Sequence, residues 1–152
     1  MASFNIINVD SDSLPRQYTG SGTIKPGMLV NINSSLAAIV HGTAGGPALP
    51  RFAIQSHLDG NGITDDYATG TLVQTITAKP GDKILARLAN GENAAVAALL
   101  ESNGDGYLRV VDADASAGDI DVHSIVGQAL EAVDMSGSNA VDPDGFILIE
   151  VW

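Results

Sequence analysis

Three histidines, His41, His57 and His123, are the side chains best suited to acid–base catalysis or to binding a transition metal. They match neither the HExxH nor the HxH spacing, so a metal site would have to be assembled by the fold. A serine hydrolase needs its nucleophile in a G-x-S-x-G turn, and the nearest stretch, Thr19-Gly20-Ser21-Gly22, departs from that pattern. The sequence also lacks the phosphate-binding motifs GxGxxG and GxxxxGK(S/T). We therefore expect that the protein is not an enzyme; a small hydrolase would require one histidine beside an acid and a serine in the fold.

Two acidic stretches have the oxygen-rich composition of calcium-binding loops. The first, 59–66, begins like an EF-hand loop, but Ile63 and Thr64 stand at the fifth and sixth positions, where an oxygen ligand and a glycine are needed. The second lacks the sixth-position glycine and a terminal glutamate; its oxygen-bearing residues are Asp112, Asp114, Ser116, Asp119 and Asp121. We interpret both stretches as solvated turns and expect no metal and no cofactor.

The composition limits the classes of partner. The chain has 152 residues, enough for one domain with a substantial core, and no cysteine, so it forms no disulfide. Its net charge is −11, and the stretch from Val110 to Trp152 contains nine acidic residues without one Lys or Arg. We expect neither nucleic acid nor a membrane as a partner, because affinity for phosphate groups comes from Lys and Arg. The acidic residues form either a solvated face or a surface for a basic partner.

The elements that must position these residues are short apolar runs separated by turn signals. Asn-Gly and Asp-Gly dipeptides at 90–91, 103–104 and 105–106 accept the positive φ angles of tight turns. The pattern predicts a mostly β fold, a single compact β-barrel or sandwich over residues 21–152 that follows an N-terminal arm, residues 1–20. Residues 94–102 have high helix propensity but lie between turns, which favours a strand or irregular structure. The predicted strand-like runs are 22–32, 36–42, 50–58, 70–78, 82–89, 94–102, 107–111, 123–133 and 146–152.

Seven short motifs between Gly22 and Ala132 resemble those of the head decoration proteins, or capsid cement proteins, of tailed bacteriophages. They occur in the same order as in that family. The motifs are GTIKPGMLV (22–30), HGTAGGP (41–47), LDGNGITDDYATG (58–70), PGD (80–82), LANGEN (88–93), LLESNGDG (99–106) and VGQALEA (126–132). One position departs from the family, whose members usually carry a Gly-Asp turn where this chain has Ala97-Ala98.

The resemblance implies a virion structural protein without catalytic residues. Such a protein is made in the host cytoplasm and docks on the outer surface of the expanded icosahedral capsid. There it clamps neighbouring subunits of the major capsid protein against the pressure of the packaged genome. By analogy with lambda-type decoration proteins we expect a homotrimer, and a dimer on twofold sites stays open.

The N-terminal arm is the segment from which we expect capsid contacts. Phe4, Ile6, Ile7 and Val9 alternate in the manner of a strand that is added to an exposed edge of a capsid sheet. Alternatively, these four residues form the first strand of the chain's own domain. Trp152 ends a run that alternates like a half-buried strand, and it serves either as a lid on the core or as an anchor between protomers.

A carbohydrate-binding or cell-surface-binding β module is the alternative function. Such a module needs exposed aromatic side chains, and the whole chain has three Phe, three Tyr and one Trp. The amino-terminal residues also have neither the basic region nor the long apolar run of a signal peptide.

Overall fold

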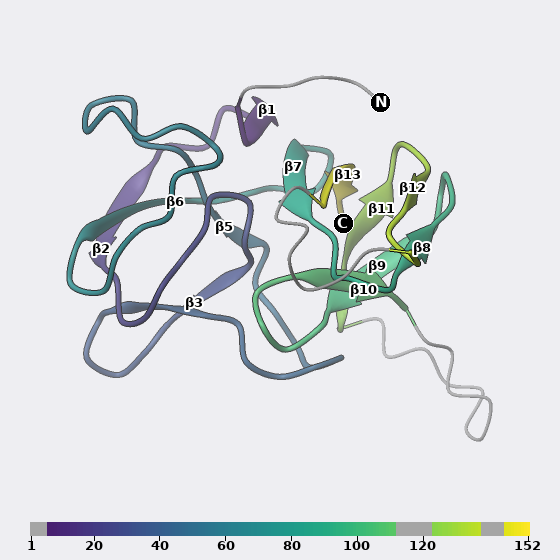
Figure 1. Cartoon of the computed structure of the whole chain (residues 1–152), viewed down its shortest axis with the longest axis horizontal. Coiled ribbons are helices and arrows are strands. Elements are labelled where there is room, and N and C mark those ends of the chain that lie inside the picture. The colour runs from purple at the N-terminus through teal and green to yellow at the C-terminus, as the bar shows by residue number, and fades with distance from the viewer. Residues whose placement is uncertain (1–5, 112–122, 138–144) are drawn as a thin grey trace.

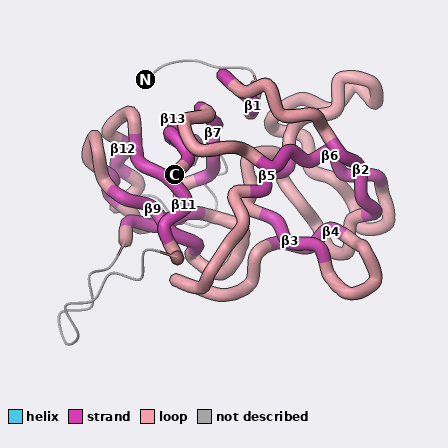
Figure 2. The backbone as a smooth tube through the Cα atoms, turned by 180° about the vertical axis from the view of Figure 1, so that it is seen from behind, coloured by secondary structure: helices cyan, strands magenta, loops and turns pink. Residues whose placement is uncertain are grey.

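The structure, a computed structural model, describes residues 6–111, 123–137 and 145–152, in which all regular elements are strands (Figures 1 and 2). None of these described residues forms a helix that could cross a membrane. The predicted mostly β class is confirmed, because the described residues form strands and no helix. The strands are β1 (Asn8–Asp10), β2 (Arg16–Thr19), β3 (Val30–Ile32), β4 (Ala38–Val40), β5 (Arg51–Ala53), β6 (Leu72–Thr77), β7 (Lys83–Arg87), β8 (Asn93–Ala94), β9 (Leu99–Ser102), β10 (Leu108–Val110), β11 (Ile125–Ala129), β12 (Val133–Asp134) and β13 (Phe146–Val151).

The strands pair in antiparallel fashion into four sheets, which form two adjoining lobes (Figure 1). One lobe contains a six-stranded sheet with the order β1-β7-β13-β11-β9-β10 and the small β12-β8 pair. The other contains the sheets β2-β6-β5 and β3-β4, which are joined by single bridges between Gly20 and Ala38 and between Leu29 and Phe52. Within the described residues no sheet closes completely, so the structure does not support the closed-barrel form of the fold prediction.

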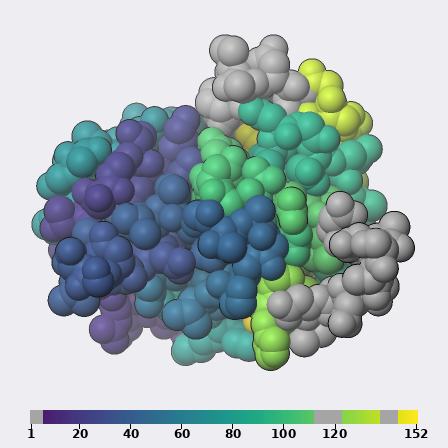
Figure 3. All heavy atoms as spheres, turned by 90° about the horizontal axis from the view of Figure 1, so that it is seen from below, coloured from purple at the N-terminus to yellow at the C-terminus, as the bar shows by residue number. Residues whose placement is uncertain are grey.

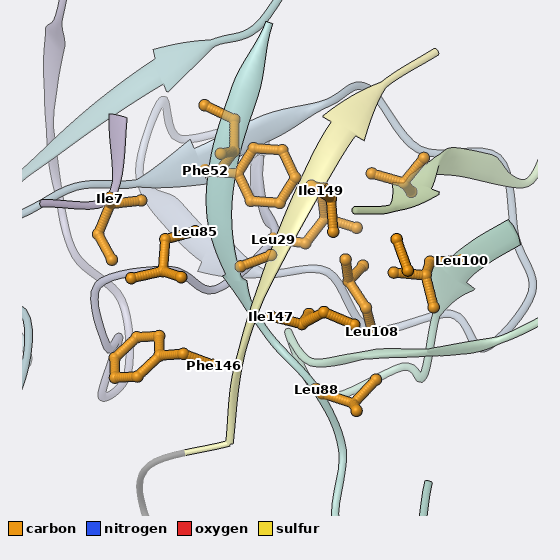
Figure 4. Packing of buried hydrophobic residues seen from close by; sticks show 14 of the residues in the cluster. Ile7, Leu29, Phe52, Leu85, Leu88, Leu100, Leu108, Phe146, Ile147 and Ile149 are labelled. Atoms are coloured by element: carbon orange, nitrogen blue, oxygen red, sulfur yellow. The ribbon is translucent and has the colours of Figure 1, made fainter. Parts of the chain in front are cut away.

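One hydrophobic core connects the two lobes. Figure 4 shows Ile147 and Ile149 of β13 packed among side chains from β7, β9 and β10. Ile7, Leu29 and Phe52 reach the same cluster from the N-terminal half of the chain. A smaller cluster, which includes Tyr67, fills the second lobe. Burial of these side chains contributes about 1.5–3 kcal/mol for each large aliphatic or aromatic residue, so the lobes stabilise one another.

The predicted strand runs are mostly confirmed, but the strands are shorter than the runs. The ambiguous run 94–102 contains the end of β8 and the whole of β9, with no helix. Run 22–32 forms a strand only at Val30–Ile32. Residues 1–20 were expected to form an arm, yet β1 pairs with β7 and β2 pairs with β6, so the described part of this segment belongs to the same sheets as the rest of the chain.

The turn before β9 keeps a left-handed conformation without a glycine. Ala97 has a φ of 69°, at the position where the resembled family carries glycine. The turn is held on β11, because the Ala97 N–H donates to Ala129 O at 2.8 Å and Gln128 Nε2 donates to Ala97 O at 3.2 Å. Ala97 thus has a backbone conformation that glycine favours.

We expect Ala97→Gly to raise the free energy of unfolding by about 0.5–1 kcal/mol. The left-handed conformation costs an L-residue roughly 1–2 kcal/mol, and the greater entropy of glycine in the unfolded chain offsets part of the gain. Urea denaturation measures the difference. Ala95→Gly, two residues earlier and at negative φ, is the control and should be destabilising. If both substitutions lower the stability, the turn at Ala97 is not strained.

Candidate functional site

The four N-terminal residues expected to contact a partner occupy different environments. Phe4 lies outside the described residues. Ile6 is 38% exposed, whereas Ile7 is fully buried in the main core. Val9 is half-buried and packs against the same core. Among the described members of this set, Ile6 is thus the side chain that reaches solvent most.

The backbone around Ile7 is also engaged inside the chain. The Ile7 N–H donates to Gln55 Oε1 at 3.0 Å, and the Ile7 carbonyl accepts the N–H of Leu85 at 2.8 Å. In β1, Asn8 lies opposite Ile84 of β7. The structure thus has the arrangement in which this segment is the first strand of its own sheet, the alternative left open by the sequence. Contact of Ile7 with another protein would require this pairing to open.

A turn at residues 79–82 fastens the N-terminal segment. Ser11 Oγ donates to Asp82 Oδ2 at 2.5 Å, and the Lys79 N–H donates to the same oxygen at 2.8 Å. Ser13 Oγ lies 3.5 Å from this oxygen. One carboxylate therefore closes its own turn and holds the segment that leads from β1 to β2. Leu14, next in that segment, is 83% exposed.

The same turn also binds the C-terminal strand. The Gly81 N–H donates to Val151 O, and the Val151 N–H donates to Asp82 O, both at 2.9 Å. Trp152 follows directly and is 57% exposed, so it does not serve as a lid on the core in this structure. We call Ile6, Leu14, Trp152 and the outer edge of β1 the terminal surface. Among the described residues, it combines exposed apolar side chains with the edge of β1 that pairs with no other strand, two features of protein interfaces.

An exposed ion pair lies beside this surface. Lys79 Nζ is 2.7 Å from Asp12 Oδ1. This hydrogen bond and the lysine's charge hold the pKa of Asp12 below its ordinary 3.8, and the same contact raises the pKa of Lys79 above 10.5. Because the carboxyl pKa is depressed, the attraction is present above pH 3.8 and is lost as the pH falls through the lowered pKa.

We expect Lys79→Met to return the pKa of Asp12 towards 3.8, since the first cause of its shift is then removed. An NMR titration of the Asp12 carboxyl group measures the change. Lys83→Met is the matched control, because Lys83 pairs with Asp10, 3.7 Å away, and should leave Asp12 unchanged. An Asp12 pKa that stays low in Lys79→Met would show that another group causes the shift.

A buried serine and histidine meet under the loop 41–47. His41 Nδ1 lies 2.7 Å from Ser102 Oγ, and His41 Nε2 lies 3.2 Å from the Pro47 carbonyl oxygen. Since that carbonyl can only accept, a neutral imidazole with its hydrogen on Nε2 satisfies both contacts and accepts the Ser102 hydroxyl hydrogen on Nδ1. Ser102 Oγ in turn accepts the Gly104 N–H at 3.1 Å.

Glu101, the acidic residue that precedes Ser102, is hydrogen-bonded to other side chains. Glu101 Oε1 accepts from Arg109 Nε at 2.8 Å, and Glu101 Oε2 accepts from Ser124 Oγ at 3.0 Å. Glu101 is 5% exposed and Ser102 is fully buried, so no substrate reaches the serine in this structure. The fold thus brings together one histidine and one serine, as the hydrolase alternative requires, but in a closed arrangement that fastens a loop. Figure 3 shows that loop's segment (blue) packed on the lobe that contains β9 and β10 (green).

The first acidic loop is engaged in turn contacts. Ser56 Oγ donates to Asp59 Oδ2 at 2.6 Å, the Gly62 N–H donates to Asp65 Oδ2 at 2.7 Å, and Lys25 Nζ lies 3.7 Å from Asp66 Oδ2. In the part of the chain that the structure describes, no three His, Asp or Glu side chains gather as metal ligands would. The second acidic stretch, 112–121, lies outside the described residues.

The sequence motifs did not identify Arg87, which heads the large fully buried side chains of the described residues. Its Nε donates to Pro26 O at 2.7 Å, one NH₂ donates to Ile63 O at 3.1 Å, and its guanidinium carbon lies 4.5 Å from the centroid of the Phe146 ring. Arg87 therefore joins the Pro-Gly turn at 26–27 and the loop 57–66 to the six-stranded sheet. The sequence signal is a cation at the end of β7, between the apolar residues Ala86 and Leu88.

No model of a known protein family matches the chain, and a search of curated proteins finds no match either.

Proposed function

We propose that the chain is a head decoration, or capsid cement, protein of a tailed bacteriophage. It binds the outer surface of the expanded icosahedral capsid and stabilises contacts between subunits of the major capsid protein. The observation that carries the proposal is the resemblance of seven short motifs, in the same order, between Gly22 and Ala132. A single such motif is a common turn signature, whereas seven in order along most of the chain are specific.

The structure supports this proposal through the turns in which those motifs lie. Gly27, Gly81, Gly91 and Gly104 all have positive φ, between 87° and 93°. The motifs thus specify particular backbone turns, which a shared fold would require. In this proposal the protein is a compact β-sandwich without a catalytic role. Its loops and terminal segments provide the surfaces that contact other proteins.

The terminal surface is the capsid contact that we propose. Leu14 and Trp152 flank a turn to which Ser11 and Val151 are hydrogen-bonded, so these side chains are presented on ordered backbone. A symmetric oligomer, for which we favour a trimer over a dimer, would engage several capsid subunits at once. Modest contacts then combine into strong binding through effective concentration. An interface of about 1,600 Å² in total would suffice for a specific complex.

Co-sedimentation with expanded, undecorated heads of the encoding phage tests the contact. We expect the double variant Leu14→Ser, Trp152→Ser to bind at least tenfold more weakly, since buried Trp side chains often contribute about 2 kcal/mol or more to interfaces. Val96→Ser removes an equally exposed apolar side chain in the turn before β9 and is the control. Unchanged binding by the double variant would exclude the terminal surface, and no binding by the native chain would contradict the function.

A further inference from the structure

A hollow whose lining includes no residue of the terminal surface is formed largely by the loop that joins β5 and β6. Its volume is about 490 Å³, and its lining includes Gln17 of the edge strand β2 together with Leu58, Asp59, Asp66, Tyr67 and Leu72. Most of the lining belongs to the motif at 58–70, and the proposed capsid contact does not use this hollow.

Two apolar side chains that line the hollow are unusually accessible. Leu58 is 89% exposed, the highest value among the large hydrophobic residues described, and Leu72 is 54% exposed. Tyr67 lines the same hollow, is almost fully buried, and its hydroxyl donates to Ile54 O at 2.7 Å. Single exposed leucines are common on protein surfaces, whereas two in one hollow with a tyrosine form a place for an apolar side chain.

The loop that carries Leu58 is held in place by hydrogen bonds. The Asn61 N–H donates to Ser56 O at 2.9 Å, and Ser56 Oγ binds the Asp59 carboxylate. Further along, Arg87 donates to Ile63 O from the core. Leu58 is thus presented on a pre-organised loop, which reduces the entropy cost of binding a partner.

The charge beside these leucines is negative. Asp59 and Asp66 both line the hollow, and Lys25 Nζ lies 3.7 Å from Asp66 Oδ2. The charge of Asp59 also reaches Tyr67: burial is the main cause that raises the pKa of Tyr67, and Asp59 adds to the rise. A partner that places a cation here would gain from both carboxylates and from the net charge of −11.

We propose that this hollow docks a protein segment in which a Lys or Arg neighbours a large apolar side chain. The apolar side chain packs between Leu58 and Leu72, and the cation pairs with Asp59 and Asp66. The proposal commits one part of the acidic surface to a basic partner, and it does not depend on the capsid function.

Fluorescence anisotropy with a short labelled peptide that alternates Lys and Leu tests the proposal. We expect Asp59→Asn with Asp66→Asn, and separately Leu58→Ser with Leu72→Ser, to weaken peptide binding at least tenfold. Glu131→Gln with Glu150→Gln removes the same charge from the other lobe and should change the affinity less than threefold. Thermal melting shows whether each variant is folded, and both leucines are exposed enough to be replaced without disturbing the core.

Three results would overturn the proposal. Equal weakening by the Glu131 and Glu150 control would mean that net charge alone attracts the peptide. Equal affinity for a peptide with Ser in place of Leu would mean that the hollow attracts cations without recognising an apolar side chain. No binding of the Lys-Leu peptide would exclude the site. We expect the same variants to co-sediment with phage heads as the native chain does. This measurement separates a failure of the docking proposal from a failure of the proposed capsid function.

Discussion

Replacing Arg87 with alanine is expected to lower the free energy of unfolding by about 3–5 kcal/mol. The substitution leaves the Pro26 and Ile63 carbonyls without the donors that now bind them. It also removes the cation above the Phe146 ring and opens a cavity at a fully buried position. Each lost acceptor contact costs roughly 1–3 kcal/mol, so this single change removes a large part of the stability of an ordinary domain.

Urea denaturation of three variants separates the causes. Arg87→Lys keeps a cation but cannot span both carbonyls with a planar fork, so we expect it to be intermediate. Arg51→Ala is the control: Arg51 is only half-buried, lies 5.8 Å from the Tyr18 ring, and should cost less than about 1 kcal/mol. An Arg87→Ala protein as stable as the native one would mean that Arg87 does not join the two lobes.

The second large effect is expected at Ile7. Ile7→Ala should lower the free energy of unfolding by about 2–4 kcal/mol, the usual range for removing a fully buried isoleucine side chain. Ile6→Ala, at the neighbouring position, should change it by no more than about 0.5 kcal/mol because the side chain reaches solvent. The comparison of two adjacent isoleucines measures directly which side of β1 faces the core.

Substitutions at Ile6 and Ile7 also test whether the N-terminal segment is a docking arm. A deletion of residues 1–12 would remove β1 and Ile7 together, so any loss of head binding could come from loss of structure. Ile7→Val, which should cost about 0.5–1.5 kcal/mol, keeps the strand and is the better variant for binding studies. If Ile7→Ala is as stable as Ile6→Ala, the pairing of β1 with β7 does not hold in solution, and a free docking arm becomes the better description.

Local signals account for the part of the fold that was predictable. Alternating burial along residues 147–151 follows the two-residue period of a strand, and the turn glycines mark the boundaries of the strands before and after them. These features depend on neighbours within a few residues. The strand class and most strand positions therefore follow from the sequence alone, including the run 94–102 with its high helix propensity.

The remaining features depend on contacts distant in sequence. Arg87 and Pro26 are 61 positions apart, and His41 and Ser102 are also 61 positions apart, so no local pattern shows that they meet. The alternation around Ile7 fits a strand in any sheet; the Gln55 side chain and β7 determine which sheet it joins here. The exposure of Leu58 and Leu72 likewise depends on how the β5–β6 loop is held.

Electron cryo-microscopy of the purified protein mixed with expanded, undecorated heads of the encoding phage tests the central claim most directly. Mock-treated heads provide the control. We predict regular added density at symmetry positions on the outer surface, with three copies of the chain at each site and the terminal surface turned towards the capsid. Bare heads, in the presence of folded protein from the same phage, would contradict the assignment as a capsid cement.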